Sequence, residues 1–210
     1  MKIVFLLFER VTALDAIGPY EVLSRLPGAD VKFVAAEAGP VRTDNGFLGL
    51  HADHRRDAIE HADLLLIPGG VGTRALCEDK ATLAWVRRIH ANTTWTTSVC
   101  TGSLVLAAAG LLDGLTAVTH WSMMDELTGL GAVATPGRYH FANDKIVTAA
   151  GVSAGIDMAL ALTARIGGEG LAQALQLGIE YDPAPPFDAG SVEKAPAEIV
   201  TLVRSAIDRG

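Results

Sequence analysis

Cys100 is the residue of this sequence whose type and position most strongly suggest chemistry. It lies in the segment SVCTGS (98–103), between a β-branched run typical of a strand and an apolar run typical of a helix. A side chain on a tight strand-to-helix turn points out of the sheet, and the positive end of the following helix favours the nucleophilic thiolate. The sequence therefore predicts a nucleophile at Cys100, with a buried, inert cysteine as the alternative.

Asp15 and the pair Gly69-Gly70 are two further candidates. Asp15 precedes a helical pattern, where a carboxylate commonly caps the helix or interacts with its positive end. In the functional interpretation it faces Cys100 and moves protons for it. Gly69 and Gly70 follow an apolar run, so their N–H groups could approach an anion or oxyanion closely, although a plain turn has the same sequence.

Short apolar runs that alternate with helical patterns indicate the elements that position these residues. The pattern predicts one α/β domain over residues 1–210, with a mostly parallel sheet covered by helices on both faces. From about residue 179 a carboxyl-terminal extension is expected to pack on the domain or on a dimer partner. Asn45-Gly46 predicts a hairpin turn within 41–50. Strands are expected at 2–8, 31–36, 64–67, 93–99, 117–119, 139–141 and 146–148, and helices at 18–26, 79–91, 104–109, 154–166, 170–177 and 197–207.

The expected strands bring the candidates together. In an open α/β sheet, ligands bind beyond the carboxyl ends of the strands. Three runs, ending at Phe8, Ile67 and Val99, lead to the acid, the glycine pair and the cysteine. If these strands are neighbours, the three features meet in one crevice. His120 follows another expected strand and is a candidate for orienting or shuttling protons there, with a hydrogen-bonded structural histidine as the alternative.

Composition excludes several classes of protein. Half of the 210 residues are hydrophobic and 20% are charged, which predicts a substantial core and excludes a disordered chain. A net charge of −7 without a basic stripe argues against nucleic acid and membrane surfaces as partners. Cys77 and Cys100 do not form a metal-ligand or disulfide pattern, so no metal is expected, and Cys77 is predicted to be inert. Without a recognisable signal peptide or span, a cytoplasmic protein is expected.

Five segments, in register along the chain, resemble the DJ-1/PfpI superfamily, whose members have a flavodoxin-like fold with a cysteine on a nucleophile elbow. Within the superfamily, the stretch QLGIEYDPAPPF (176–187) is similar to the isocyanide hydratase branch. An aspartate in place of the usual glutamate, and Thr101 in place of the histidine of the peptidase-like branch, separate this chain from other branches. The five segments are LDAIGP (14–19), IPGG (67–70), SVCTGS (98–103), THW (119–121) and GVSAGID (151–157).

The resemblance implies a cofactor-free lyase that adds water to a small isocyanide and releases an N-substituted formamide. Cys100 would form a covalent thioimidate, Asp15 would act as acid and base, and Thr101 would hydrogen-bond within the site. Family members commonly form homodimers, so a homodimer is expected. The residues implied on the substrate side are Gly69, Gly70, His120, Gly151 and Val152.

Other functions stay open at this point. A glyoxalase-like enzyme acting on 2-oxoaldehydes would also begin with thiolate attack. A ligand- or oxidant-sensing module would use Cys100 without turnover. The domain also resembles the amino-terminal sensor half of AraC-type regulators, but a helix-turn-helix region is not expected here, so a free-standing enzyme is preferred.

Overall fold

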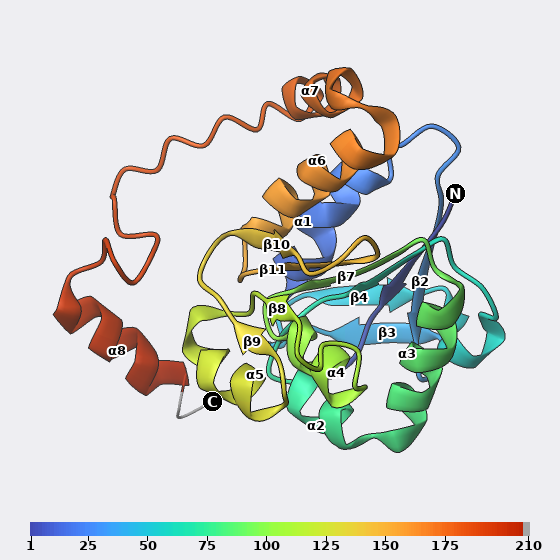
Figure 1. Ribbon diagram of the computed structural model, residues 1–210, viewed down its shortest axis with the longest axis horizontal. Coiled ribbons are helices and arrows are strands. Elements are labelled where there is room, and N and C mark those ends of the chain that lie inside the picture. Colours follow the sequence, from blue (N-terminus) through green and yellow to red (C-terminus); the bar gives the residue numbers. More distant parts are fainter. Residues whose placement is uncertain (208–210) are drawn as a thin grey trace. The chain divides into compact units, whose positions relative to one another are not determined.

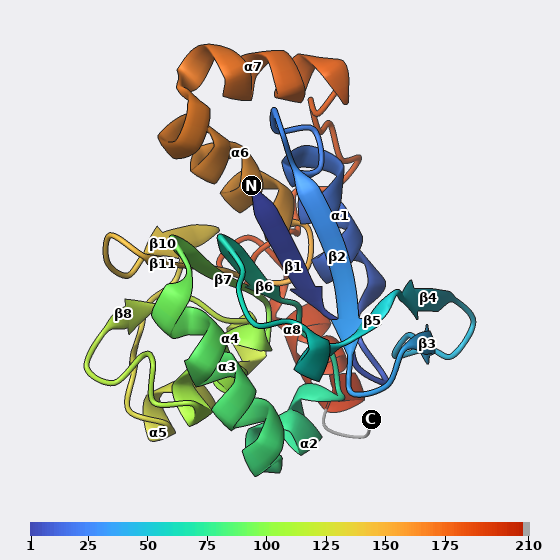
Figure 2. The ribbon, with the colours of Figure 1, turned by 90° about the vertical axis from the view of Figure 1, so that its right-hand side faces the viewer.

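A seven-stranded sheet forms the centre of the fold (Figures 1 and 2). In the computed structural model, which describes residues 1–207, the strand order is β10-β11-β7-β6-β1-β2-β5. All neighbouring pairs are parallel except β10–β11, so the expected mostly parallel sheet is confirmed. The strands are β1 (Lys2–Leu6), β2 (Asp30–Ala35), β5 (His54–Arg55), β6 (Leu64–Ile67), β7 (Trp95–Val99), β10 (Tyr139–Phe141) and β11 (Ile146–Ala149).

Helices cover both faces of this sheet (Figure 2). Helices α1 and α6 pack on one face, followed by α7 against α6, and α3, α4 and α5 contribute to the core on the other face. The helices of this part of the chain are α1 (Ala13–Leu23), α2 (Thr73–Glu78), α3 (Lys80–Asn92), α4 (Gly102–Ala108), α5 (Met124–Gly129), α6 (Ala154–Gly167) and α7 (Glu169–Gly178), with short 3₁₀ turns η1 (Arg56–Ala58) and η2 (Trp121–Met123).

Strand β6 shows why the sheet is buried on both sides. Successive side chains of a strand point to opposite faces. Leu64 and Leu66 belong to the core under α1 and α6, whereas Leu65 and Ile67 belong to the core under α3 and α4. All four side chains are fully buried, as a continuous apolar run predicts for a central parallel strand.

Helix α1 begins earlier than expected. The expected helix started at Gly18-Pro19, but the helix runs over Ala13–Leu23 and Pro19 lies inside it. A proline in a helix interior removes one backbone hydrogen bond, a cost that packing must offset. A Cβ atom at Gly155 of α6 would lie 2.9 Å from Pro19 Cγ, so the ring fills the tight contact between α1 and α6. Asp15 is thereby placed in the first turn of α1.

Two small sheets lie beside the main one. The hairpin of β3 (Gly39–Arg42) and β4 (Gly49–Ala52) is antiparallel, and Gly46 in its loop has a φ of 76°, which confirms the expected turn. The strand expected at 117–119 is β8 (Thr116–Ala117), which pairs with β9 (Val133–Ala134) and stays outside the main sheet. The next residue, Val118, contacts the main sheet through its N–H, which donates to the Thr148 hydroxyl of β11 at 2.8 Å.

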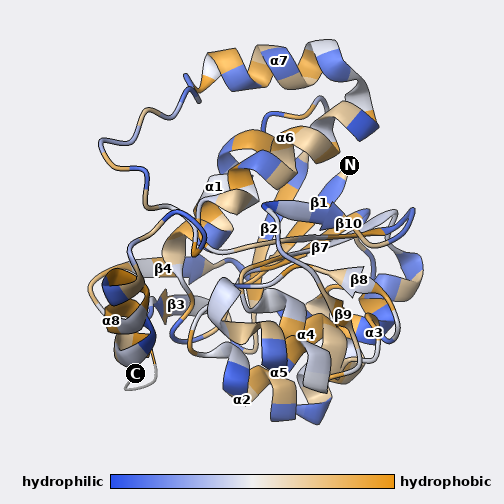
Figure 3. Cartoon of the chain, turned by 60° about the vertical axis from the view of Figure 1, so that its left-hand side comes forward, coloured by the Kyte–Doolittle hydropathy of each residue, from blue (hydrophilic) through white to orange (hydrophobic). Residues whose placement is uncertain are grey.

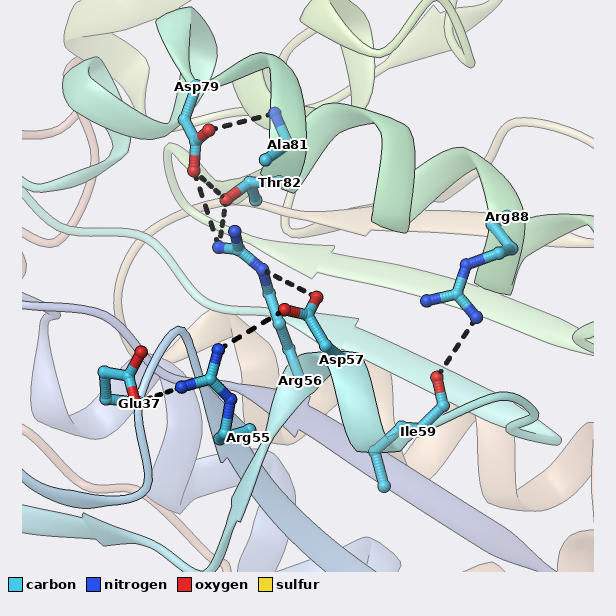
Figure 4. A network of polar contacts seen from close by, with 9 residues as sticks. All are labelled: Glu37, Arg55, Arg56, Asp57, Ile59, Asp79, Ala81, Thr82 and Arg88. Carbon is cyan, nitrogen blue, oxygen red and sulfur yellow. Dashed lines mark hydrogen bonds and ion pairs between the residues drawn. The ribbon is translucent and has the colours of Figure 1, made fainter.

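A buried arginine links η1 to the start of α3 (Figure 4). Arg56 is 8% exposed, and its Nη1 atom donates to the Thr82 hydroxyl and lies 3.4 Å from the Asp79 carboxylate. Asp79 also caps α3 by accepting a hydrogen bond from the Ala81 N–H. The Thr82 hydroxyl, together with these partners, lowers the pKa of Asp79. The network therefore attaches the segment between β5 and β6 to the start of α3.

The chain divides into two units, Met1–Ile179 and Glu180–Gly210. The second begins where the carboxyl-terminal extension is expected. It contains α8 (Ala197–Ile207), which carries apolar and polar positions (Figure 3) and has no buried residue. What this segment packs against stays a prediction. Within residues 1–207, no helix combines the length and apolar character needed to cross a bilayer.

Candidate active site

The three expected features meet at one edge of the sheet. Strands β1, β6 and β7 are consecutive neighbours and run parallel, so their carboxyl ends lie side by side. A Cβ atom placed on Gly69 would lie 2.7 Å from Asp15 Oδ2 and 2.7 Å from Cys100 Cβ. Only a glycine at this position lets the acid and the cysteine approach each other this closely.

Cys100 forms a strained turn between β7 and α4. Its φ is 56°, a left-handed value that a residue with a side chain adopts at a cost of about 1–3 kcal/mol. The backbone around it is held firmly: its N–H donates to Ala149 O at 3.0 Å, and its carbonyl accepts from the Thr119 and Ser103 hydroxyls, each at 3.1 Å. These contacts hold the sulfur in a fixed direction at the end of β7.

Asp15 presents its carboxyl group to this sulfur. The side chain is fully buried, and Oδ2 accepts a hydrogen bond from the Gly69 N–H at 3.0 Å. The carboxyl also interacts with the Cys100 thiol. Among residues 1–207, Asp15 Oδ1 has no partner in a hydrogen bond of normal geometry. This oxygen is therefore available to exchange a proton with a bound molecule.

The two groups share a site that disfavours charge. Burial raises the pKa of Asp15 to about 7, although the Gly69 N–H and the Cys100 thiol oppose the shift. Burial, and next the negative charge of Asp15, raise the pKa of Cys100 well above its ordinary value. Both effects oppose the thiolate that the expected helix field would favour. Helix α4, which supplies that field, spans only Gly102–Ala108.

Thr101 and the glycine pair lie beside Asp15 and Cys100. The N–H and hydroxyl of Thr101 both interact with the Cys100 sulfur, and both favour the thiolate. The Gly70 N–H donates to Thr101 Oγ1 at 2.9 Å, and the Gly69 N–H is taken by Asp15. The two amides expected to meet a ligand are thus already used to position the acid and the threonine. The glycines shape the site rather than offering free donors.

His120 and Gly151 lie on another side of the sulfur. A Cβ atom on Gly151 would come within 2.5 Å of His120 Cδ2 and 3.0 Å of Cys100 Sγ. His120 Nδ1 lies 2.8 Å from the Ser122 hydroxyl, and burial lowers the pKa of the ring, which favours the neutral imidazole. Val152, half-buried, follows Gly151 in the same turn. Of the sequence-predicted residues, Asp15, Thr101 and Gly151 thus lie at the Cys100 sulfur, and Gly69 and His120 lie next to them.

Comparison with known proteins decides the family. Residues 1–165 match the sequence pattern of the DJ-1/PfpI family. The chain belongs to the DJ-1/PfpI family. Among DJ-1/PfpI relatives, the isonitrile hydratase of Pseudomonas putida is 43% identical over 204 residues, which cover 97% of this chain and 89% of that protein.

A solved structure and a transcriptional regulator are also similar to this chain. A crystal structure of a ThiJ/PfpI family protein from Pseudomonas syringae has a TM-score of 0.94 and 38% identity, and covers 99% of this chain and 86% of that one. The helix-turn-helix-type transcriptional regulator CdhR of Pseudomonas aeruginosa is 31% identical, over 79% of this chain but 49% of the regulator.

Thr119 is a further residue in contact with Cys100, and its position in the sequence predicts no role for it. It lies in the THW segment, is 1% exposed, and its hydroxyl donates to the Cys100 carbonyl. The signal in the sequence that could have indicated this contact is a threonine that follows a short strand and precedes His120. Cys77, in contrast, lies in α2, where burial and then the carboxylates of Glu126 and Glu78 raise its pKa to about 11. No group of three or more metal-binding side chains occurs within the described part of the chain.

The buried acid of this DJ-1/PfpI fold has a cost in stability that depends on pH. Because the pKa of Asp15 rises from 3.8 to about 7 on folding, stability is present at low pH and is lost as pH rises between these values. Asp15→Asn should therefore raise the free energy of unfolding at pH 8 by about 2 kcal/mol more than at pH 5. Urea unfolding of both proteins at the two pH values measures this difference. An equal effect at both would contradict the shifted pKa.

Proposed function

We propose that this protein is an isocyanide hydratase, a cysteine-dependent lyase that converts an isocyanide and water into an N-substituted formamide. The carrying observation is the 43% identity to Pseudomonas putida isonitrile hydratase over nearly the whole chain. The contact between Asp15 and Cys100 supports it, because hydration of an isocyanide needs a nucleophile and a proton donor at the same carbon.

In the first step, Cys100 adds to the terminal carbon of the isocyanide. The pair carries one proton, either on sulfur or on the carboxyl. As the sulfur–carbon bond forms, this proton passes to the same carbon by way of Asp15, and the carbon–nitrogen triple bond becomes a double bond. The product is a thioimidate on Cys100, and Asp15 is left as a carboxylate.

In the second step, Asp15 acts as the base. Its carboxylate takes a proton from water while the oxygen adds to the thioimidate carbon, and Asp15 then passes this proton to the nitrogen. Collapse of the tetrahedral adduct breaks the carbon–sulfur bond and forms the carbonyl of the formamide. The hydroxyl proton of the adduct passes to the Asp15 carboxylate as the sulfur leaves, so the pair again carries one proton. The sequence draws only on side chains and water.

Other residues of the site assist these steps in the proposal. The N–H and hydroxyl of Thr101 stabilise the negative charge on sulfur while it attacks and leaves. The neutral ring of His120, with Gly151 and Val152, bounds the space for the substrate. Gly69 and Gly70 hold Asp15 and Thr101 in place through their N–H groups.

An assay with an alkyl isocyanide tests the function. Loss of the isocyanide carbon–nitrogen stretch in the infrared should be matched, mole for mole, by the N-substituted formamide in mass spectrometry. Methylglyoxal, tested in parallel, addresses the glyoxalase-like alternative. Turnover of methylglyoxal with no reaction of any isocyanide would overturn the proposal.

The oxidant-sensing alternative is less well supported by the site. A peroxide-sensing cysteine is oxidised through its thiolate. Burial, and next the negative charge of Asp15, raise the pKa of Cys100 well above its ordinary value, which lowers the fraction of thiolate. The same property suits an enzyme that must deliver both sulfur and proton to one carbon.

The pH dependence of the reaction follows from the pair. The reactive form is the one in which Asp15 and Cys100 share one proton. This form is reached when the pH exceeds the Asp15 pKa of about 7. We expect kcat/KM to fall about tenfold per pH unit below that value and to decline again once the thiol ionises. Initial rates, corrected for the uncatalysed reaction, provide the profile. A lower limb centred near pH 4 would indicate that Asp15 keeps its ordinary pKa.

We also propose that the enzyme works as a homodimer in the cytoplasm. Exposed apolar side chains support a second copy as partner: Leu14 is 41%, Leu48 48% and Phe47 90% exposed. Two free cysteines suit a reducing compartment. The segment from residue 180 onward, whose α8 exposes Leu202 to 62%, is proposed to pack on the domain or on that partner. Light scattering of the full chain and of Phe47→Ser tests the dimer; an unchanged monomer mass in both would exclude it.

A further inference from the structure

The turn between β11 and α6 sets the space above the reacting sulfur. It spans residues 150–153 and brings Gly151 so close that even a Cβ atom would lie 3.0 Å from Cys100 Sγ. The turn leads into α6, which contacts β10 (Figure 1). A small displacement of this turn therefore changes how large a group fits beside Cys100.

Arg138, just before β10, holds this turn at several points. Its carbonyl accepts a hydrogen bond from the Ala150 N–H at 2.9 Å, at the start of the turn. Its Nη1 atom donates to the Ser153 hydroxyl at 3.1 Å, at the end of the turn. Its Nε atom donates to the Asp157 carboxylate at 2.5 Å, one helical turn further on. The guanidinium thus reaches around the turn from the start of β10 to α6.

We propose that Arg138 is a positioning residue that holds the 150–153 turn against Cys100 and so limits the size of the isocyanide substituent. The relevance to isocyanides rests on the proposed function, whereas the effect on access to Cys100 does not. Arg138 touches no reacting atom. It acts through Ser153 and Asp157, which are polar anchors at the beginning of α6.

The ion pair is partly exposed, which sets the expected magnitude. The side chain of Arg138 is 49% exposed and that of Asp157 is 24% exposed. Partly exposed ion pairs contribute modestly to stability, so the 150–153 turn should loosen rather than unfold when the pair is lost. We therefore expect the selectivity between bulky and small reagents to change by about threefold, which is the scale of a partly exposed ion pair.

Alkylation of Cys100 tests the effect on access without relying on turnover. Iodoacetamide and the bulkier N-phenyl iodoacetamide are reacted with the native protein and with Arg138→Met, and the modified Cys100 peptide is quantified by mass spectrometry. The ratio of the bulky to the small reagent's rate should rise about threefold in the variant. The matched control is Arg55→Met, which removes another exposed, ion-paired arginine at the opposite edge of the sheet (Figure 4).

A charge exchange separates positioning from a general loss of structure. Asp157→Asn should reproduce the Arg138→Met ratio, and the double variant should add little to either. Arg138→Asp combined with Asp157→Arg should restore much of the selectivity. For isocyanides, KM for a bulky substrate should fall relative to a small one, with kcat nearly unchanged. Equal rate ratios in native protein, Arg138→Met and Asp157→Asn would overturn the proposal even if hydration itself is demonstrated.

Discussion

Cys100→Ser is expected to abolish isocyanide hydration, lowering kcat by at least about 10⁴-fold. The serine hydroxyl fits the same left-handed turn, whose φ is 56°, and leaves Asp15 and Thr101 in place. A hydroxyl is far less nucleophilic than a sulfur atom and ionises at much higher pH, so it cannot form the thioimidate at a useful rate. The measurement is isocyanide loss at saturating substrate in native protein and variant.

Cys77→Ser is the matched control for this variant. Cys77 is the other free cysteine and lies in α2, where its raised pKa of about 11 keeps it a thiol. This substitution should leave kcat within about twofold of the native value. Mass spectrometry of acid-quenched reactions should find the substrate mass on the Cys100 peptide. Turnover in Cys100→Ser, or an adduct on Cys77, would refute the proposed nucleophile.

Asp15→Asn should have the second largest effect, lowering kcat by about 10²–10⁴-fold, the usual contribution of a positioned acid or base. The amide oxygen can still accept the Gly69 N–H, so the geometry of the site is kept. The amide can neither deliver a proton to the isocyanide carbon nor take one from water. Both chemical steps should therefore slow, and the measurement is single-turnover formation and decay of the Cys100 adduct.

The stability of this variant makes the result decisive. Because Asp15→Asn removes a buried acid with a raised pKa, the protein should unfold at higher urea concentration at pH 8 than the native protein. Loss of activity together with increased stability cannot come from misfolding. If kcat stays within about tenfold of the native value, the acid–base role of Asp15 is wrong.

The central strands were predictable because burial alone determines them. The run Leu64–Ile67 has no polar residue, is short and ends at Pro68-Gly69-Gly70, as is typical of a strand covered on both faces. Local signals failed where tertiary contacts outweigh them. Pro19 predicts a helix start, but its ring packs against Gly155 inside α1. Likewise β8, two residues long, pairs with β9 rather than with the main sheet, which nothing in its sequence indicates.

The site was predictable in its members but not in its electrostatics. The acid, the cysteine and the glycine pair each follow one of three neighbouring strands, so topology brings them together. The protonation of Cys100 depends on how much water reaches the sulfur and how near the carboxyl lies, which sequence spacing does not determine. Arg138 was missed because its partners Ser153 and Asp157 lie on another element, and exposed arginines are common.

The long separation along the chain of the groups around Cys100 has a consequence during biosynthesis. The backbone partner of this residue, Ala149, and the neighbouring Gly151 leave the ribosome well after the cysteine itself. Until they arrive, the thiol is solvated and ionises near its ordinary pKa of about 8.5. The growing polypeptide is therefore more vulnerable to peroxide than the finished enzyme, and a sulfinate acquired at that time would have to be buried beside Asp15. Oxidative stress should reduce the yield of newly made protein before it inactivates what has already folded.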